Sequence, residues 1–284
     1  MHDTLIIQSQ RQPLPHAWLG ACIDSVKRWA QEQSFDYQFI GDELFDTLPA
    51  WVMEKTRSQK VIATDLARLK CLQNFLAAGY ERVVWLDADF LIFAPADFQL
   101  PKVGELPECY ALGREVWVQP KNAGQKAGQK AGQKAGQKAV NNTAVKFKAY
   151  KKVHNAFLLF DAQFGQRNSF LDFYSSHAER LLKQISGTLN DGLVSMPPQF
   201  IGPKLLTALH NIVQCPVQEN AGMLSPWTMN DLLTGGGPAL TLFRAKSPQP
   251  LAGANLCSSL EASDALPDRA MEKVVAQLLA KGRI

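Results

Sequence analysis

Residues 80–93, YERVVWLDADFLIF, place two acids inside an otherwise apolar run. The β-branched and aromatic stretch 83–86 predicts a strand buried on both faces. Asp87 and Asp89 follow it directly, and buried carboxylates are costly unless a positive group compensates them. At the carboxyl end of a parallel strand they would lie where open α/β sheets bind ligands. The small Ala88 lets the backbone approach a bulky ligand, so the stretch predicts a Mg²⁺ or Mn²⁺ site shared with substrate phosphates.

The alternative is a D-x-D that occurs by chance in a solvated turn, since so short a pattern is frequent. Here the two acids interrupt a core strand rather than a polar loop. Burial of charge in such a segment needs a compensating partner, which favours a metal or nucleotide site.

The remaining chain alternates strand and helix patterns, which predicts an α/β fold of the doubly wound type. The helix at 60–77 has the clearest 3.6-residue spacing, and Gly79 follows it as a stop signal. The expected strands are 4–7, 35–40, 83–86, 109–118 (a strand pair or one bent strand) and 153–161, and the expected helices are 18–29, 60–77, 169–185, 204–210 and 268–279.

With 284 residues, 46% hydrophobic and 20% charged, the chain predicts one domain over 1–284 with a lysine-rich insertion at 119–150. Residues 123–138 repeat AGQK four times, which favours a flexible surface loop, with a clamp for an anionic acceptor as the alternative. The stretch 121–152 holds nine lysines and no acid, so subtracting nine from the net charge of +4 leaves −5 elsewhere. This local basicity argues against a general nucleic-acid partner.

Five scattered cysteines without C-x-x-C spacing argue against a disulfide framework or a zinc site and suit a reducing cytoplasm. The apolar part of the amino terminus is too short for a signal peptide, and no run approaches a membrane span. We therefore expect a cytoplasmic protein. Peripheral membrane contact through the helix at 268–279 is the weaker alternative to packing on the domain.

Other polar residues belong to elements near this strand. Asp65 and Arg68 are three apart on the helix that leads into it, so they share one helix face. A surface ion pair is one interpretation, and a pocket wall with an arginine for a phosphate or sugar hydroxyl is the other. His154 and Asn155 open a core strand, where they are either structural or pocket residues.

Several segments, in order, resemble GT-A-fold glycosyltransferases of the D-x-D type. The resemblance is to family 32, described as a sugar-binding region containing a DXD motif, with features of family 8. The segments are QSQRQPLPHAW, TDLARLKCL, VVWLDADFLIF, VHNAFLLF, QFIGPKLLT and ANLCSS, which span about residues 5 to 260.

The resemblance implies a Rossmann-like mixed sheet flanked by helices and a retaining, metal-dependent hexosyltransferase. The donor would be a UDP- or GDP-sugar, the cofactor Mn²⁺ or Mg²⁺, and the acceptor a polysaccharide, lipid-linked glycan or protein. Asp87 and Asp89, with Asn255, would hold the metal, and Asp161 and Asp191 are candidates for positioning the acceptor or stabilising positive charge on the sugar. The donor-binding candidates are Gln8, Asp65, Arg68, Asp87, Ala88, His154 and Asn155.

The chain departs from that pattern at three places. Ala78-Gly79 replaces a Gly-Gly pair before the strand, Asn255 stands where a metal-binding histidine often occurs, and the lysine insertion has no counterpart. An asparagine carbonyl can still coordinate a hard cation. Two other functions stay open: a metal-dependent nucleotidyltransferase or nucleotide hydrolase, and a carbohydrate-binding protein of the same fold without turnover.

Overall fold

The computed structural model describes residues 2–121, 145–185, 197, 199–260 and 265–284. Its main sheet has six strands in the order β2-β1-β3-β6-β5-β7, and a second sheet has three in the order β4-β9-β8. The strands are β1 His2–Ser9, β2 Asp36–Ile40, β3 Tyr80–Leu86, β4 Phe90–Ile92, β5 Tyr110–Pro120, β6 Phe147–Asp161, β7 Val217–Gln218, β8 Ala221–Met223 and β9 Gly253–Asn255.

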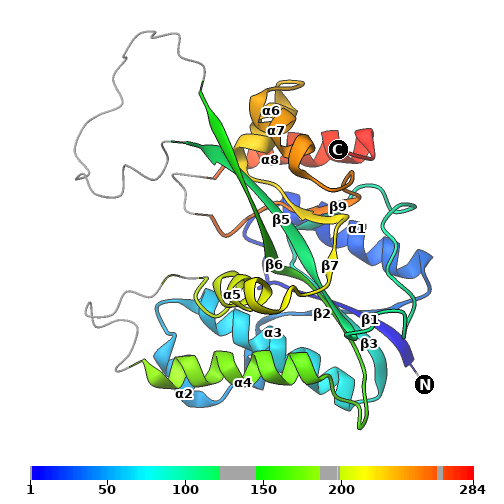
Figure 1. Ribbon diagram of the computed structural model, residues 1–284, viewed down its shortest axis with the longest axis vertical. Helices are drawn as coiled ribbons and strands as arrows, with labels where there is room; N and C mark the ends of the chain where they lie inside the picture. The colour runs from blue at the N-terminus through cyan, green and yellow to red at the C-terminus, as the bar shows by residue number, and fades with distance from the viewer. Residues whose placement is uncertain (1, 122–144, 186–196, 198, 261–264) are drawn as a thin grey trace.

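Helices cover both faces of the main sheet (Figure 1). They are α1 Trp18–Glu32, the 3₁₀ helix η1 Asp42–Thr47, α2 Ala50–Lys55, α3 Lys60–Ala77, α4 Ser169–Gln184, α5 Pro203–Val213, α6 Pro226–Leu233, α7 Pro238–Lys246 and α8 Asp268–Lys281. The expected α/β architecture, a mixed sheet flanked by helices, is confirmed. Within the described residues, no helix combines the length and apolar character needed to cross a bilayer.

The sheet is mixed because β1, β2 and β3 are parallel while β6 runs antiparallel to β3. Strand β3 is buried on both faces, as its apolar run predicts. Val84 and Leu86 pack in one core with α1 and α8, and Val83 and Trp85 pack in another with α3 and α4. Alternation along the strand therefore fixes which side chains face which layer.

Strands β5 and β6 form a long antiparallel ribbon with a bulge between Leu112 and Gly113. The stretch 109–118, expected as a strand pair or a bent strand, is therefore one irregular strand that begins at Tyr110. Beyond the bulge the ribbon runs past α7 towards the upper left of Figure 1. The strands extend into the range expected as an insertion, where Lys121 N–H donates to the Lys146 carbonyl at 2.8 Å. The AGQK repeat itself lies outside the described residues.

Candidate functional site

The Asp87-Ala88-Asp89 segment joins the two sheets at the carboxyl ends of the parallel strands β1 and β3. Strand β3 ends at Leu86, and β4 begins at Phe90 in the smaller sheet. The turn is tight because Phe90 N–H donates to the Asp87 carbonyl at 2.9 Å. Ala88 is buried within it. The backbone thus holds both carboxylates at the sheet edge where α/β proteins bind ligands.

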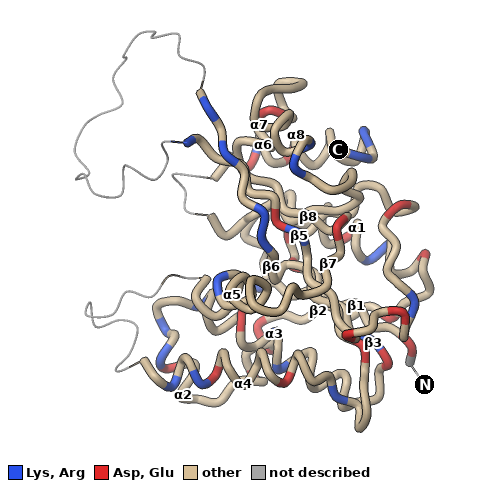
Figure 2. Tube along the Cα trace, viewed as in Figure 1, with Lys and Arg blue, Asp and Glu red and all other residues tan. Residues whose placement is uncertain are grey.

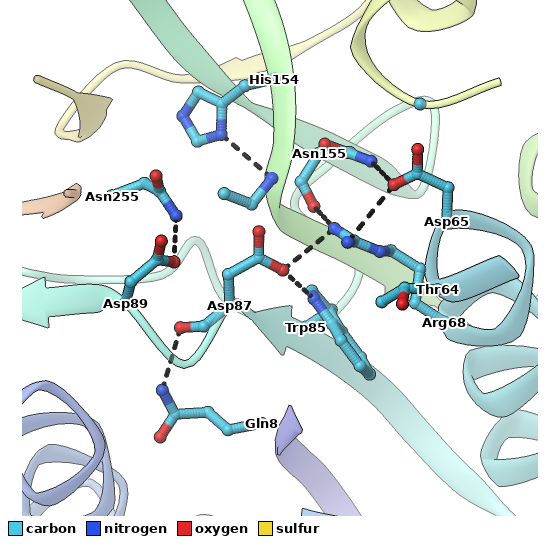
Figure 3. Close-up of polar contacts among 12 residues, drawn as sticks. Gln8, Thr64, Asp65, Arg68, Trp85, Asp87, Asp89, His154, Asn155 and Asn255 are labelled. Atoms are coloured by element: carbon cyan, nitrogen blue, oxygen red, sulfur yellow. Dashed lines mark hydrogen bonds and ion pairs between the residues drawn. The ribbon is translucent and has the colours of Figure 1, made fainter. Parts of the chain in front are cut away.

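Asp87 is held by two donors on one carboxylate oxygen. Trp85 Nε1 donates to Oδ1 at 2.7 Å, and Arg68 Nη1 lies 3.0 Å from the same atom (Figure 3). Within the described residues, Oδ2 of Asp87 makes no hydrogen bond, and the side chain keeps 26% of its surface exposed. Asp87 therefore has a fixed orientation and a free oxygen for a ligand.

Arg68 is the centre of a buried polar network. Besides Asp87, its guanidinium donates to the Asn155 carbonyl at 2.7 Å and lies 3.3 Å from Asp65 Oδ1. It also lies over the Trp85 ring, 5.3 Å from the centroid. Burial lowers the pKa of Arg68, but Asp87 and Asp65 outweigh this and the net shift is upward. The Asp65–Arg68 pair is therefore part of this network and not a surface ion pair.

Asp65 is almost completely buried and only partly satisfied. Its Oδ1 accepts from Asn155 Nδ2 at 2.7 Å, whereas Oδ2 is buried and lacks a hydrogen bond within the described residues. Burial raises the pKa of Asp65 to about 6, although Arg68 and Asn155 oppose the shift. The amino end of α5 packs closely against this carboxylate at Gly202. A side chain there would not fit, because its Cβ would lie 2.3 Å from Asp65 Oδ2.

Asp89 faces the smaller sheet and is buried. Its Oδ1 accepts from Asn255 Nδ2 at 2.5 Å, and its Oδ2 accepts from the Ser258 N–H at 2.6 Å. Burial, and then the charge of Asp87, raise the pKa of Asp89. Asn255 turns its amide nitrogen towards Asp89, because its oxygen accepts from Cys257 N–H at 2.8 Å.

Gln8 supports the segment from β1. Its Nε2 donates to the Asp87 carbonyl at 3.1 Å, and its Oε1 accepts from Tyr37 OH at 3.0 Å. Both ends of the Gln8 amide are therefore engaged with protein groups. In the structure, Gln8 positions the backbone of Asp87.

His154 is fully buried beside β8. Its Nε2 lies 3.2 Å from the Ala221 carbonyl, and its Nδ1 accepts from Ala156 N–H at 3.2 Å, which requires the neutral tautomer with hydrogen on Nε2. Burial lowers its pKa to about 4. The ring also packs on Gly113, where a Cβ would lie 2.2 Å from Cε1. These contacts give His154 a structural part in joining the ribbon to the smaller sheet.

Asp161 lies at the other end of β3 from Asp87. It pairs across the sheet with Arg82, whose Nε and Nη2 donate to the two carboxylate oxygens at 2.5 and 2.9 Å. Both side chains are almost fully buried. The structure therefore does not bring Asp161 to the site, and it fixes the start of β3 instead. Asp191, the other acceptor-positioning candidate, lies outside the described residues.

The donor set around Asp87 and Asp89 fits a hard divalent cation. Among the described residues, no group of three or more His, Cys, Asp or Glu side chains is arranged to hold a metal by itself. Two carboxylates completed by substrate phosphates are nevertheless a usual arrangement for Mg²⁺. The free oxygen of Asp87 and the crowded charges of Asp87 and Asp89 suit such an ion. Asn255 would join it only through its oxygen, which now accepts from Cys257.

Three contributors to the site were not expected as site residues. Trp85 holds Asp87, Gly202 abuts Asp65, and the Ser258 backbone binds Asp89. Strand alternation could have indicated Trp85, because residues two apart point to the same side. The contacts of Gly202 and Ser258 join segments far apart in the sequence, and no local pattern signals them.

Comparison with known proteins finds no family model and no curated protein that match the chain. Among solved structures, the chain is similar to a glycosyltransferase involved in the glycosylation of the major capsid of PBCV-1. The two share 10% sequence identity over 95% of this chain and 99% of the other, with a TM-score of 0.43. At this TM-score the likeness supports no inference about activity, so the proposal below rests on the geometry of the site.

Proposed function

We propose that the chain is a metal-dependent glycosyltransferase that moves a hexose from a UDP- or GDP-sugar to a polysaccharide, lipid-linked or protein acceptor, with retention at the anomeric carbon. The observation that carries the proposal is the placement of Asp87 and Asp89 at the carboxyl end of β3, with Arg68 fixed 3.0 Å from Asp87. Two carboxylates beside a buried guanidinium suit a cation bound to a diphosphate, together with the sugar attached to it.

The site residues form two groups, one for the diphosphate with its metal ion and one for the sugar. Asp87 and Asp89 would hold a Mn²⁺ or Mg²⁺ ion, which when bound supplies Lewis-acid stabilisation of the leaving diphosphate. Asp65 and Arg68 would hold the sugar, since Asp65 Oδ2 and Arg68 Nε are buried polar atoms without hydrogen bonds in the described structure. Hydroxyl groups or ordered water would satisfy such atoms. Asn155 would act with them through its contact with Asp65.

The proposal assigns no enzymic nucleophile. Asp161 is engaged with Arg82 at the far end of β3. Ala88 and Gln8 would act through the backbone, Ala88 by leaving room at the turn and Gln8 by fixing the Asp87 carbonyl. Their part is to orient the turn on which the two carboxylates stand.

A panel of UDP- and GDP-sugars tests the proposal. Nucleotide release and thermal unfolding are measured together with Mn²⁺, with Mg²⁺ and with EDTA. We expect at least one nucleotide sugar to raise the midpoint of unfolding and to release nucleotide only when a divalent ion is present. Consumption of nucleoside triphosphates with release of pyrophosphate or phosphate would instead indicate a nucleotidyltransferase or hydrolase. Donor binding without nucleotide release under any acceptor would indicate a sugar-binding protein.

A further inference from the structure

The β5–β6 ribbon beyond its bulge has one covered face and one open face. The covered face holds Val116, Val118 and Phe147, which pack against the core formed with α6 and α7. Phe147 meets Trp227 of α6 with ring centroids 5.7 Å apart. Because side chains alternate along a strand, the neighbouring residues point away from this core.

The open face, which we call the lysine face, consists of Trp117, Gln119, Lys148, Tyr150 and Lys152. Directly across the two strands, Trp117 pairs with Tyr150 and Gln119 pairs with Lys148. The Nζ atoms of Lys148 and Lys152 lie 5.1 and 5.6 Å from the centroid of the Tyr150 ring. Two ammonium groups are thus held on either side of an exposed aromatic ring, next to a second aromatic side chain.

The charge of this part of the chain is strongly one-sided. No Asp or Glu occurs between Glu115 and Asp161. Of the nine lysines within 121–152, five belong to the described ribbon and its ends: Lys121, Lys146, Lys148, Lys151 and Lys152. Basic residues follow the upper part of the ribbon in Figure 2. The rest of the chain has a net charge of −5, so an anion is drawn to the ribbon and not to the surface in general.

The lysine face is linked to the candidate site through the smaller sheet. At its base, Glu115 pairs with Lys152 across the strands, with Oε1 4.0 Å from Nζ. Glu115 is buried there. Two residues beyond Lys152, His154 contacts the Ala221 carbonyl of β8 at 3.2 Å. Strand β8 pairs with β9, whose Asn255 binds Asp89, so the base of the lysine face is joined to the Asp87–Asp89 segment through the smaller sheet.

We propose that the lysine face is the docking surface for an anionic saccharide chain, which is the acceptor of the proposed transfer. The exposed Tyr150 ring and the half-buried Trp117 ring offer flat apolar surfaces to sugar rings. The ammonium groups beside Tyr150 offer partners for carboxylate or phosphate substituents. The inference rests on the proposed function for the identity of the acceptor. The binding surface itself rests on the ribbon geometry and the charge.

Single-stranded nucleic acid is the competing ligand, because aromatic and basic side chains also bind stacked bases. The negative charge of the rest of the chain and the nearness of a site proposed for sugar transfer favour the saccharide. Both ligand classes are therefore included in the test.

Calorimetric titration at low ionic strength tests the proposal with four probes: hexagalacturonate, neutral maltohexaose, inorganic phosphate and an oligothymidylate. We expect hexagalacturonate to bind, and maltohexaose and phosphate to bind at least about tenfold more weakly, because the surface needs both rings and charges. The K148Q/K152Q variant should lose about tenfold in affinity for hexagalacturonate. Trp117→Leu should lose roughly threefold or more.

The matched control is K273Q/K281Q, which removes two exposed lysines from α8 and should bind like the natural chain. Equal loss in both double variants, no loss in K148Q/K152Q, or tighter binding of the oligothymidylate would overturn the proposal. Metal-dependent nucleotide release without acceptor is measured on the same proteins and should not change in K148Q/K152Q. If hexagalacturonate binding depends on the lysine face while no nucleotide sugar is turned over, the proposed function fails and the saccharide surface stands.

Discussion

Arg68 of α3 and Asp87 at the end of β3 form a buried ion pair, with Nη1 3.0 Å from Oδ1. The same guanidinium also contacts Asp65 and the Asn155 carbonyl. One cation therefore compensates two carboxylates that would otherwise be costly to bury. It also ties the helix before β3 to the turn after it, which makes Arg68 both a stabilising and a positioning residue.

Arg68→Ala should lower the free energy of unfolding by about 3–5 kcal/mol, because it leaves two carboxylates without their cation. Arg68→Lys should recover part of that stability but little donor turnover, since one ammonium cannot reproduce the planar contacts with Asp65, Asp87 and Asn155. Urea unfolding and nucleotide release measure the two effects. Full donor turnover in Arg68→Lys would show that the arrangement of the guanidinium is not needed.

Asp89→Asn should abolish metal-dependent nucleotide release with only a small change in stability. The substitution removes a buried charge that Asp87 repels, and this gain offsets the loss of about one hydrogen bond at Asn255 or Ser258. Asp46→Asn, an exposed site on η1, is the matched control for loss of one acid. Retained nucleotide release in Asp89→Asn would remove this carboxylate from the proposed reaction.

Gly202→Ala should destabilise the protein by about 1–3 kcal/mol and weaken donor binding. The new methyl group would overlap Asp65 Oδ2 and the Asn155 amide, at 2.3 and 2.7 Å. Gly20→Ala in α1 is the control, because nothing lies within 4 Å of its Cβ position. The control should gain about 0.5–1 kcal/mol from the better helix propensity of alanine. Equal stability of both variants would mean that α5 can shift away from Asp65.

Asp161→Asn should lower the free energy of unfolding by about 3 kcal/mol or more, because it leaves Arg82 buried without its carboxylate. Nucleotide release per folded molecule should stay unchanged, since this pair lies at the opposite end of β3 from Asp87. Replacing Arg82 and Asp161 together by leucine should cost less than Asp161→Asn alone. A fall in turnover without a fall in stability would contradict this structural role and would support a role of Asp161 in positioning the acceptor.

His154 should lower the free energy of unfolding in acid. Its folded pKa of about 4 lies below the ordinary value near 6.5, so the unfolded chain binds more protons between these values. The contribution of His154 to the free energy of unfolding is complete above pH 6.5. It is lost as pH falls towards 4, by about 3 kcal/mol in total. Arg114 and Arg68 add to the effect of burial, while the contacts of the ring with the Ala221 and Gly222 backbone oppose it.

His154→Gln isolates this effect, because its amide can replace both hydrogen bonds of the ring without titrating. The raised pKa of Asp65 acts in the opposite direction, since the folded state then holds the proton more firmly and stability falls as pH rises past 4. Comparing urea unfolding of the natural chain and His154→Gln at pH 7 and pH 4.5 cancels the Asp65 contribution. Parallel loss of stability in both proteins would show that His154 does not titrate as expected.

Local sequence patterns determined the elements that build the site. The run before Asp87 specified a strand buried on both faces, and the spacing of residues 60–77 specified the helix that brings Asp65 and Arg68 to it. Both rest on interactions between near neighbours, because strand alternation and helix periodicity are properties of a few consecutive residues. The α/β class followed from their order along the chain.

Only the tertiary structure decided which polar groups meet. Asn255 reaches Asp89 across 166 positions of sequence, and Arg82 captures Asp161 across 79. Such contacts depend on the strand order of two sheets and on the register between β3 and β6, which no local pattern encodes. For that reason the acidic pair after β3 was visible in the sequence, while the separation of Asp161 from it appeared only when β6 was placed antiparallel to β3.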